Sequence, residues 1–298
     1  MIAQALGSEL KLDVLETTHR GHAALAAAEA AADGFDVVLA HGGDGTVNEV
    51  VNGLLAAPGA DPGGPEDLPA VAVVPGGSAN VFARALGTPR DPGEATARIL
   101  AALRARRSSL VGLGRVELGR EGGPGRWFTF NAGLGWDAEV VAAVERARAA
   151  GREATPMRYA ATALRHYLDQ RRRPRSMTVE VSGAAPVSDV RLAFITTTHT
   201  WTYLGSRAVR TNPGTSVRSG LGLFGMRDLG AGTVAPNLRR ILVPGGDPRG
   251  RNVLRQDAVA AIAVRSAEPV ALQVDGEHLG RLRDVRFRAV RDALRVVV

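Results

Sequence analysis

A glycine-rich turn between two apolar patterns constrains the fold of this chain more than any other stretch. Residues 35–40 form an apolar run that is short enough for a buried strand. Residues 47–55 carry valine and leucine at the three- and four-residue spacing of an amphipathic helix. The turn between them reads Gly42, Gly43, Asp44, Gly45, Thr46. The order of strand, tight turn and helix predicts part of an α/β domain.

This turn is a candidate binding site for a phosphate group. The start of a helix offers unpaired backbone N–H groups and a positive dipole end to an anion, and glycine lets a phosphate approach the backbone. Asp44 would repel a bare phosphate, so it favours a nucleotide that carries Mg²⁺, with Asp44 as the metal ligand. A turn that only reverses the chain is the alternative, but five motif residues between strand and helix favour phosphate binding.

A second glycine turn follows the next strand candidate. Residues 70–74 are a continuous apolar run, and a helix is expected over residues 81–86. The turn between them reads Gly76, Gly77, Ser78, Ala79, Asn80. Open α/β sheets bind their ligands at the carboxyl ends of the strands. Both turns are therefore candidates for one nucleotide site.

The overall composition excludes several classes of protein. The chain has 298 residues, 45% of them hydrophobic, which is enough for one large domain or two ordinary ones. No run of eighteen apolar residues, signal peptide or cysteine is present, so a cytosolic protein without disulfides is expected. Lys11 is the only lysine, which excludes a Walker A loop and a protein-kinase lysine. With 4% aromatic residues, nucleic acid is an unfavoured partner despite the net charge of +7.

The pattern changes near Ser109 to alternating β-branched segments separated by Gly, Pro and Asp. Most of them have no helix between them, which predicts an antiparallel β-sandwich. Two helical stretches, 137–150 and 157–170, interrupt these strands. We therefore predict an α/β plus all-β fold, with a doubly wound nucleotide-binding domain over residues 1–109 and the sandwich over 110–293. The last strand, 294–298, can return to the first domain.

The beginning of the chain is unusual for an α/β domain. Residues 1–10 resemble the end of a helix, and Lys11–Glu16 has the alternation of a strand. A parallel α/β domain normally opens with a strand and its ligand-facing loop. We therefore expect the first strand to be missing, with a truncated or misassigned start that lacks one edge of the nucleotide site.

Two carboxylates near the C-terminus are candidates for acid–base chemistry. Asp275 and Glu277 flank Gly276, and a strand would place both side chains on one face. An aspartate can accept the proton of an acceptor hydroxyl during phosphoryl transfer. An Asp-Gly hairpin turn is the alternative, and the spacing alone slightly favours it.

Four motifs in this order resemble the diacylglycerol kinase catalytic-domain family, which includes bacterial lipid kinases and sphingosine kinases. They are the two glycine turns, the segment that runs from Asn131 to Glu139, and Val274-Asp275-Gly276-Glu277. NAD kinases share only the core of the first turn. The resemblance covers nearly the whole chain from Glu16 onward and implies a two-domain kinase that uses ATP and Mg²⁺.

The resemblance also implies roles for individual residues. Thr18, at the expected end of a strand, would face the nucleotide phosphates, with reaction between the first turn and Asp275. Asp275 would act as the base, and Glu277 would polarise it or hold metal. Asn131 and Asp137 are second-rank candidates. Val81 stands where the family usually has aspartate, and residues 218–223 lack the carboxylates of a structural Mg²⁺ site, so that metal is expected to be absent.

The expected activity is transfer of the γ-phosphoryl group of ATP to diacylglycerol or a similar lipid alcohol, as part of phospholipid biosynthesis. The lipid would be met at the inner surface of the membrane, and Arg171–Arg175 is either a solvated helix end or a contact for anionic lipid. A homodimer is left open. The alternatives are a kinase for a sphingoid base or NAD, and a non-catalytic relative that binds lipid or nucleotide.

Overall fold

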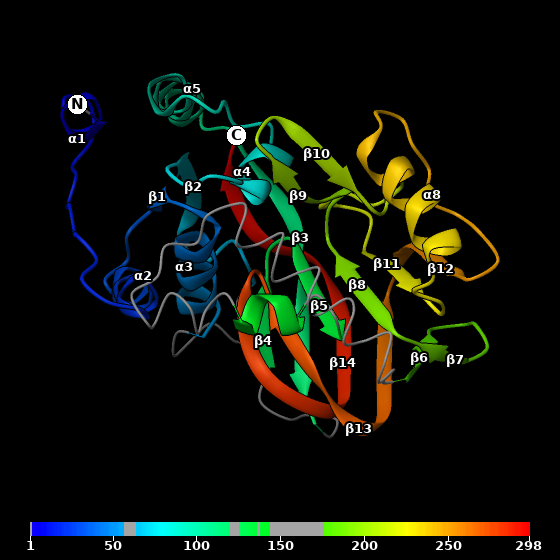
Figure 1. The fold of residues 1–298 in the computed structure, drawn as a ribbon. Helices are drawn as coiled ribbons and strands as arrows, with labels where there is room; N and C mark the ends of the chain where they lie inside the picture. The colour runs from blue at the N-terminus through cyan, green and yellow to red at the C-terminus, as the bar shows by residue number, and fades with distance from the viewer. Residues whose placement is uncertain (1, 57–63, 120–124, 136–137, 144–175) are drawn as a thin grey trace. The chain divides into compact units, whose positions relative to one another are not determined.

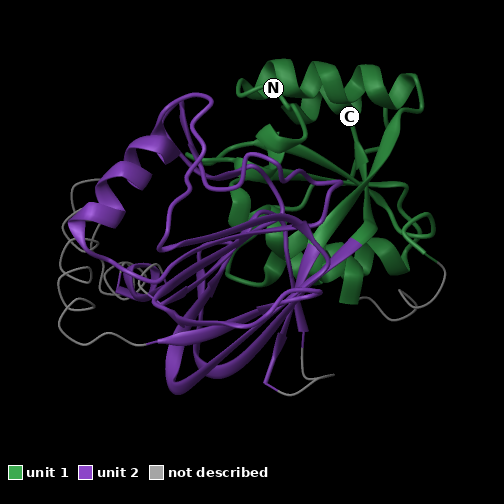
Figure 2. Ribbon diagram, turned by 90° about the vertical axis from the view of Figure 1, so that its right-hand side faces the viewer, with its two compact units in different colours: residues 1–113, 291–298 green, residues 114–290 purple. Residues whose placement is uncertain are grey.

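The computed structural model describes residues 2–56, 64–119, 125–135, 138–143 and 176–298. The chain divides into two compact units, shown in green and purple in Figure 2. Unit 1 consists of residues 1–113 and 291–298, and unit 2 consists of residues 114–290. Three predicted features lie outside the described residues: Asp137, the helix over 157–170, and Arg171–Arg175.

Unit 1 is a parallel sheet with helices on both faces (Figures 1 and 2). Strand β1 (Val37–Gly42) pairs in parallel with β2 (Ala70–Pro75), and β2 pairs with the end of β14 (Glu277–Val297) through Val71 and Val296. The helices are α1 (Ile2–Gly7), α2 (His22–Ala32), α3 (Asp44–Ala56), α4 (Val81–Ala85) and α5 (Pro92–Arg104). The predicted α/β class of this part of the chain is confirmed.

Local sequence explains why these helices form and where they pack. Asp91 caps α5, because its side chain accepts a hydrogen bond from the N–H of Glu94 at 2.9 Å, and Pro92 occupies the first turn. Helices α2 and α3 can approach closely because Gly53 has no side chain. A Cβ at this position would lie 2.1 Å from the carbonyl oxygen of Ala24. Alternate residues of β2 pack under α5, and the buried members of this cluster are Ala70, Ala72, Val74, Ile99, Ala102 and Val297.

The strand predicted over Lys11–Glu16 was wrong. These residues belong to no helix or strand, and the side chains of Val14 and Leu15 are 67% and 54% exposed. Strand β1 ends the sheet order β1-β2-β14, so no described strand pairs with its outer edge. A segment of six residues becomes a strand only when a neighbour satisfies its backbone groups, and this segment has no such neighbour among the described strands.

Unit 2 is built almost entirely from antiparallel strands. In chain order, its strands are β3 (Ser108–Leu118), β4 (Gly125–Phe128), β5 (Asn131–Gly135), β6 (Met177–Val181), β7 (Val187–Val190), β8 (Leu192–Thr196), β9 (Thr200–Leu204), β10 (Arg207–Arg210), β11 (Leu221–Met226), β12 (Val253–Val259), β13 (Ala261–Val274) and most of β14. Residues 138–143 are helical, and α8 (Ala231–Leu242) follows β11. Helix α8 and the β9–β10 hairpin were absent from the sequence prediction.

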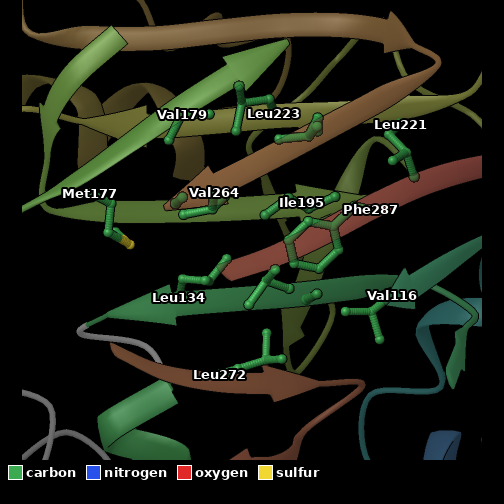
Figure 3. Packing of buried hydrophobic residues seen from close by; sticks show 14 of the residues in the cluster. Val116, Leu134, Met177, Val179, Ile195, Leu221, Leu223, Val264, Leu272 and Phe287 are labelled. Atoms are coloured by element: carbon green, nitrogen blue, oxygen red, sulfur yellow. The ribbon is translucent and has the colours of Figure 1, made fainter. Parts of the chain in front are cut away.

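The strands of unit 2 enclose one main hydrophobic core (Figure 3). The order along the sheet is β14-β13-β5-β8-β11-β12. The long strand β13 pairs with β6 through residues 262–266 and with β5 through residues 272–274. The sheet therefore continues in two directions from β13 around the same core, whose buried members include Phe128, Leu134, Ile195, Leu223 and Phe287. The predicted β-rich class of the second part is confirmed.

Strands β4 and β5 are separated by a bend at residues 129–130. The strand predicted over 294–298 is the end of the long continuous strand β14, whose last residues lie in unit 1. Among the described residues, no helix is long and apolar enough to cross a membrane.

Candidate active site

The two glycine turns of unit 1 pack backbone against backbone. They follow β1 and β2, whose parallel pairing brings Gly42 opposite Pro75, and the N–H of Gly76 donates to the carbonyl oxygen of Gly42 at 2.8 Å. A Cβ on Gly77 would lie 2.7 Å from the Cα of Gly43. Such contacts leave no room for a side chain. The mutual packing of the two turns therefore requires glycine at Gly77 and leaves little room beside Gly43 and Gly76, apart from any phosphate.

The second turn is held in shape by one side chain. Asn80 accepts the N–H of Gly77 at its Oδ1 (2.9 Å) and donates from its Nδ2 to the Gly77 carbonyl oxygen (2.6 Å). Its backbone is left-handed, with φ of 48°, a conformation that asparagine tolerates better than most residues. Gly76, Gly77 and Ser78 remain exposed. The predicted residues of this turn thus form one ordered loop whose outer surface is open.

Asp44 connects the first turn to the helix that follows the second. It is the first residue of α3, and its Oδ1 accepts a hydrogen bond from the N–H of Phe82 at the start of α4. Burial raises the pKa of Asp44, while hydrogen bonds from the backbone N–H groups of residues 80–82 oppose that shift. The carboxylate therefore caps α4 and ties the two turns together.

Gly45 and Thr46 complete the first turn, and there is open space beside Gly45. A Cβ on Gly45 would meet no atom within 4 Å, and Gly45 is exposed. Gly42 lies so close to Thr46 that a Cβ would be 2.7 Å from its Oγ1. The first N–H groups of the thirteen-residue helix α3 have no partner within the helix. Gly45 is thus the open position of this turn, and the predicted binding of a phosphate there stays a prediction.

Thr18 forms its hydrogen bonds with neighbouring histidines. Its N–H donates to the Nδ1 of His22 at 3.1 Å, and its hydroxyl lies 3.0 Å from the Nδ1 of His19. The two imidazole rings stack with centroids 4.9 Å apart. These contacts form a local cluster before α2, and the predicted phosphate-facing role of Thr18 stays a prediction.

Asp275 forms the turn between β13 and β14 in unit 2. Val274 pairs with Glu277, and both turn residues have positive φ, 47° at Asp275 and 82° at Gly276. This is the backbone of the tight hairpin turn that an Asp-Gly pair favours. The hairpin anticipated as the alternative is therefore the local structure at Asp275.

The buried carboxylate of Asp275 binds the bend between β4 and β5. Each carboxylate oxygen accepts two hydrogen bonds, and the donors are the Thr129 N–H (2.7 Å), the Thr129 hydroxyl (2.8 Å), the Phe130 N–H (3.1 Å) and the Asn131 N–H (3.0 Å). A carboxylate has about four lone-pair positions, so these donors occupy its accepting capacity. Burial nevertheless raises the pKa of Asp275 from 3.8 to about 6, because the hydrogen bonds offset only part of the desolvation.

Glu277 forms an ion pair that the sequence did not indicate, and its predicted role beside Asp275 or at a metal stays a prediction. Its carboxylate forms an ion pair with Arg126 on β4, and both side chains are about one quarter exposed. Arg126 was not among the predicted site residues. Its pairing with Glu277 spans 151 residues of sequence, so no local pattern could have identified it.

Asn131 belongs to a buried network beside Asp275. Its Oδ1 accepts from the Nε2 of Gln273, and its Nδ2 donates to the carbonyl oxygen of Trp201, both at 2.9 Å. Gln273 in turn accepts the N–H of Gly276 at 2.9 Å. Besides Arg126, sequence analysis missed Thr129 and Gln273, since single buried polar residues carry no motif of their own.

Comparison with known proteins finds similarity that is concentrated in the first third of the chain. Residues 2–111 match the family model of the diacylglycerol kinase catalytic domain. A diacylglycerol kinase of Bacillus subtilis is 49% identical over 75 residues, which are 25% of this chain and 22% of that protein. A probable lipid kinase YegS-like of Chromohalobacter salexigens is 44% identical over 84 residues, or 28% and 25% of the two chains.

A solved structure extends the likeness of fold to the whole chain. A diacylglycerol kinase from Bacillus anthracis has a TM-score of 0.67 and 17% sequence identity, covering 99% of this chain and 87% of that one. At this identity the likeness shows the fold. The aligned segments of the two curated relatives span about a fifth to a quarter of their length.

Proposed function

We propose that this protein is an ATP-dependent lipid kinase, because residues 2–111 match the family model of the diacylglycerol kinase catalytic domain. It transfers the γ-phosphoryl group of ATP to the hydroxyl group of diacylglycerol or a similar lipid alcohol. The observation that carries the proposal is the pair of packed glycine turns at the carboxyl ends of β1 and β2. They lie within the matched segment, at the edge of the sheet where α/β proteins bind nucleotides.

The exposed part of the first turn fits the phosphate groups of ATP. The N–H groups at the start of α3 offer hydrogen bonds and a positive dipole end, and the open space beside Gly45 admits a phosphate. Ser78 and Gly76 are exposed on the second turn. We assign the outer surface of both turns to the ATP phosphates.

Mg²⁺ would be held by Asp44 together with the phosphates. One carboxylate, phosphate oxygens and water are sufficient ligands for Mg²⁺ in kinases. When bound, the ion would neutralise charge on the transferred phosphoryl group.

We expect Asp44→Asn to raise the concentrations of Mg²⁺ and ATP needed for half-maximal activity while the protein stays folded. Asparagine keeps an oxygen that can accept the N–H of Phe82, but it loses the charge that attracts Mg²⁺. Steady-state kinetics at varied Mg²⁺, together with a thermal melt, measure both effects. Asp91→Asn is the matched control, because Asp91 caps α5 in the same way without a proposed ligand. Equal Mg²⁺ dependence in both variants would remove Asp44 from the metal site.

We assign to Asp275 the role of the base that accepts the proton of the lipid hydroxyl. A base works best when its pKa is near the working pH, and burial brings the pKa of Asp275 to about 6. Because four donors already surround the carboxylate, accepting this proton requires that one of these hydrogen bonds open.

The four hydrogen bonds that already occupy the Asp275 carboxylate favour one alternative function, a relative that binds lipid or nucleotide without catalysis. In that case Asp275 would only hold the bend at residues 129–131. The two functions differ in turnover, since a binding protein releases unchanged ATP and lipid.

A transfer assay with radiolabelled ATP tests the proposed function directly. The purified chain is incubated with Mg²⁺ and vesicles that contain diacylglycerol, a sphingoid base or a monoacylglycerol, and NAD is tested in solution. Labelled phosphatidic acid is the expected product. Label in NADP or sphingoid phosphate would correct the substrate class, and binding of ATP without any labelled product would establish the non-catalytic alternative.

A further inference from the structure

The exposed apolar side chains of unit 2 are concentrated on neighbouring elements. Leu204, Leu238 and Val243 are the large hydrophobic residues that are exposed among its described residues, at 62%, 51% and 45%. Leu204 ends strand β9, and the other two lie in or directly after α8. Helix α8 packs against β10, and Figure 1 shows the helix beside the β9–β10 hairpin. The three residues therefore belong to one region of unit 2.

The inner side of α8 explains why this region keeps a fixed shape. Ile241 and Val234 pack with Trp201 and Phe224 in a second hydrophobic cluster. Asp228 holds the start of the helix, because its carboxylate accepts from the N–H of Gly230 and from the hydroxyl of Thr233. The inner side of α8 is therefore fixed by packing, and Leu238 lies exposed on the helix.

The charge of the same region is strongly positive. Residues 229–251 contain four arginines and a single acidic residue, Asp247, which forms ion pairs with Arg249 and Arg255. The other arginines of this segment, Arg239, Arg240 and Arg251, are exposed and form no ion pair with the described acidic residues. The β9–β10 hairpin adds Arg207 and Arg210 and no acidic residue.

We propose that α8, the loop to residue 251 and the β9–β10 hairpin form a docking surface for an anionic lipid bilayer. The inference rests on the proposed function in that a lipid kinase must reach a substrate that stays in the membrane. An amphipathic helix with an exposed leucine and with arginines that form no ion pair with the described acidic residues inserts its apolar residues at the headgroup boundary and binds anionic headgroups with the cations. Arginine suits phosphate because its guanidinium group makes paired hydrogen bonds.

Co-sedimentation with vesicles tests the docking surface. The probes are phosphatidylcholine vesicles with and without phosphatidylglycerol. We expect the parent chain to prefer the anionic vesicles, and Arg239→Gln with Arg251→Gln to weaken that binding by roughly fivefold per arginine at low salt. Leu238→Ser with Val243→Ser should weaken binding to anionic vesicles as well, since inserted apolar area is lost.

Matched controls separate the surface from total charge and hydrophobicity. Arg283→Gln with Arg291→Gln removes the same charge from exposed positions of β14, and Leu25→Ser removes an exposed leucine from α2. These controls should bind vesicles like the parent. If they lose as much binding as the surface variants, or if the surface variants lose none, the proposal is overturned. Thermal melts verify that each variant is folded. If the variant with Arg239→Gln and Arg251→Gln does not fold, the single variant Arg239→Gln is used in its place.

Two further outcomes also decide the matter. Loss of binding only when Arg171–Arg175 is changed to glutamine would place the membrane contact there and overturn the surface at α8. Self-association that Leu238→Ser abolishes while vesicle binding is unchanged would assign the region to a second copy of the chain.

A second readout distinguishes failure of this inference from failure of the proposed function. The surface variants should phosphorylate a short-chain diacylglycerol dissolved in water at the parent rate, and long-chain diacylglycerol in vesicles more slowly. A parent chain that phosphorylates neither lipid but binds anionic vesicles through α8 contradicts the kinase and supports the surface. An active parent whose variants bind and react normally contradicts the surface alone.

Discussion

Asp275→Asn is expected to lower both the stability and the rate of this protein. The carboxylate accepts four hydrogen bonds from residues 129–131. An asparagine amide would point its NH₂ group at two of those donors. Two buried donors without an acceptor cost about 2–4 kcal/mol in the free energy of unfolding, and at neutral pH the loss of the buried charge offsets part of this cost. The rate of the folded fraction should also fall by ~10²–10⁴-fold, because asparagine cannot accept the proton of the lipid hydroxyl.

Urea denaturation and activity per folded molecule separate these two effects. Asp257→Asn is the matched control, since Asp257 is a hydrogen-bonded carboxylate of the same unit, with Asn212, Thr215 and Arg255 as donors. We expect the control to lose stability and to keep its specific activity. If folded Asp275→Asn retained more than about a tenth of the parent rate, Asp275 would be a structural clamp and Glu277 the next candidate.

The raised pKa of Asp275 also predicts how stability changes with pH. The folded-state pKa is about 6 and the ordinary value is 3.8, so between these values the folded state binds more protons than the unfolded state. Stability from this group is therefore present below about pH 4 and falls as the pH rises towards 6, by about 3 kcal/mol. Asp275→Asn should lack this decline, and a parent chain whose stability is flat over the window would contradict the raised pKa.

Gly77→Ala is expected to destabilise unit 1 and to weaken ATP binding. The new Cβ would lie 2.7 Å from the Cα of Gly43 and 3.0 Å from the Oδ1 of Asn80. Neither neighbour can move away without shifting the backbone of a turn, and overpacking of this kind costs about 1–3 kcal/mol. Since both turns move apart, the KM for ATP should rise at least tenfold, an order-of-magnitude expectation for a displaced binding loop. Calorimetry and steady-state kinetics measure the two effects.

Gly45→Ala is the matched control for the packing argument. Its Cβ would meet no atom within 4 Å, and its position in the first turn of α3 suits alanine. The melting temperature should stay the same or rise slightly, while the KM for ATP rises because a methyl group occupies the approach of the phosphate. A Gly77→Ala variant that matches the parent in both measurements would show that the turns do not depend on their close contact.

The sequence predicted the elements of unit 1 that local patterns determine. The glycine turns, the helix after each of them and the Asp91–Pro92 start of α5 depend on neighbouring residues, whose conformational preferences act over a few positions. Lys11–Glu16 had the right alternation and still formed no strand, because a strand also needs a partner that its own sequence does not supply.

The roles of the polar residues were decided by tertiary structure. From the sequence, Asp275 could be either a catalytic base or a residue of a hairpin turn. The fold shows the hairpin turn. It also shows a contact that no pattern indicated, because the Asp275 carboxylate binds residues 129–131, more than 140 positions away in the sequence. Asp44 likewise had a predicted place in the first turn but an unforeseen partner in Phe82.

For this protein, then, the amino-acid sequence by itself determined the order of strand, glycine turn and helix at both turns of unit 1, the β-rich class of the second part and the resemblance of its first third to a kinase family. Periodicity, turn chemistry and contiguous motifs are local properties, so they can be read along the chain. Tertiary structure alone decided which carboxylates are buried, which donors surround them and which face of α8 remains exposed. Burial and hydrogen bonding between distant strands arise only when the chain packs, and they set the pKa of Asp275 and the surface at Leu238.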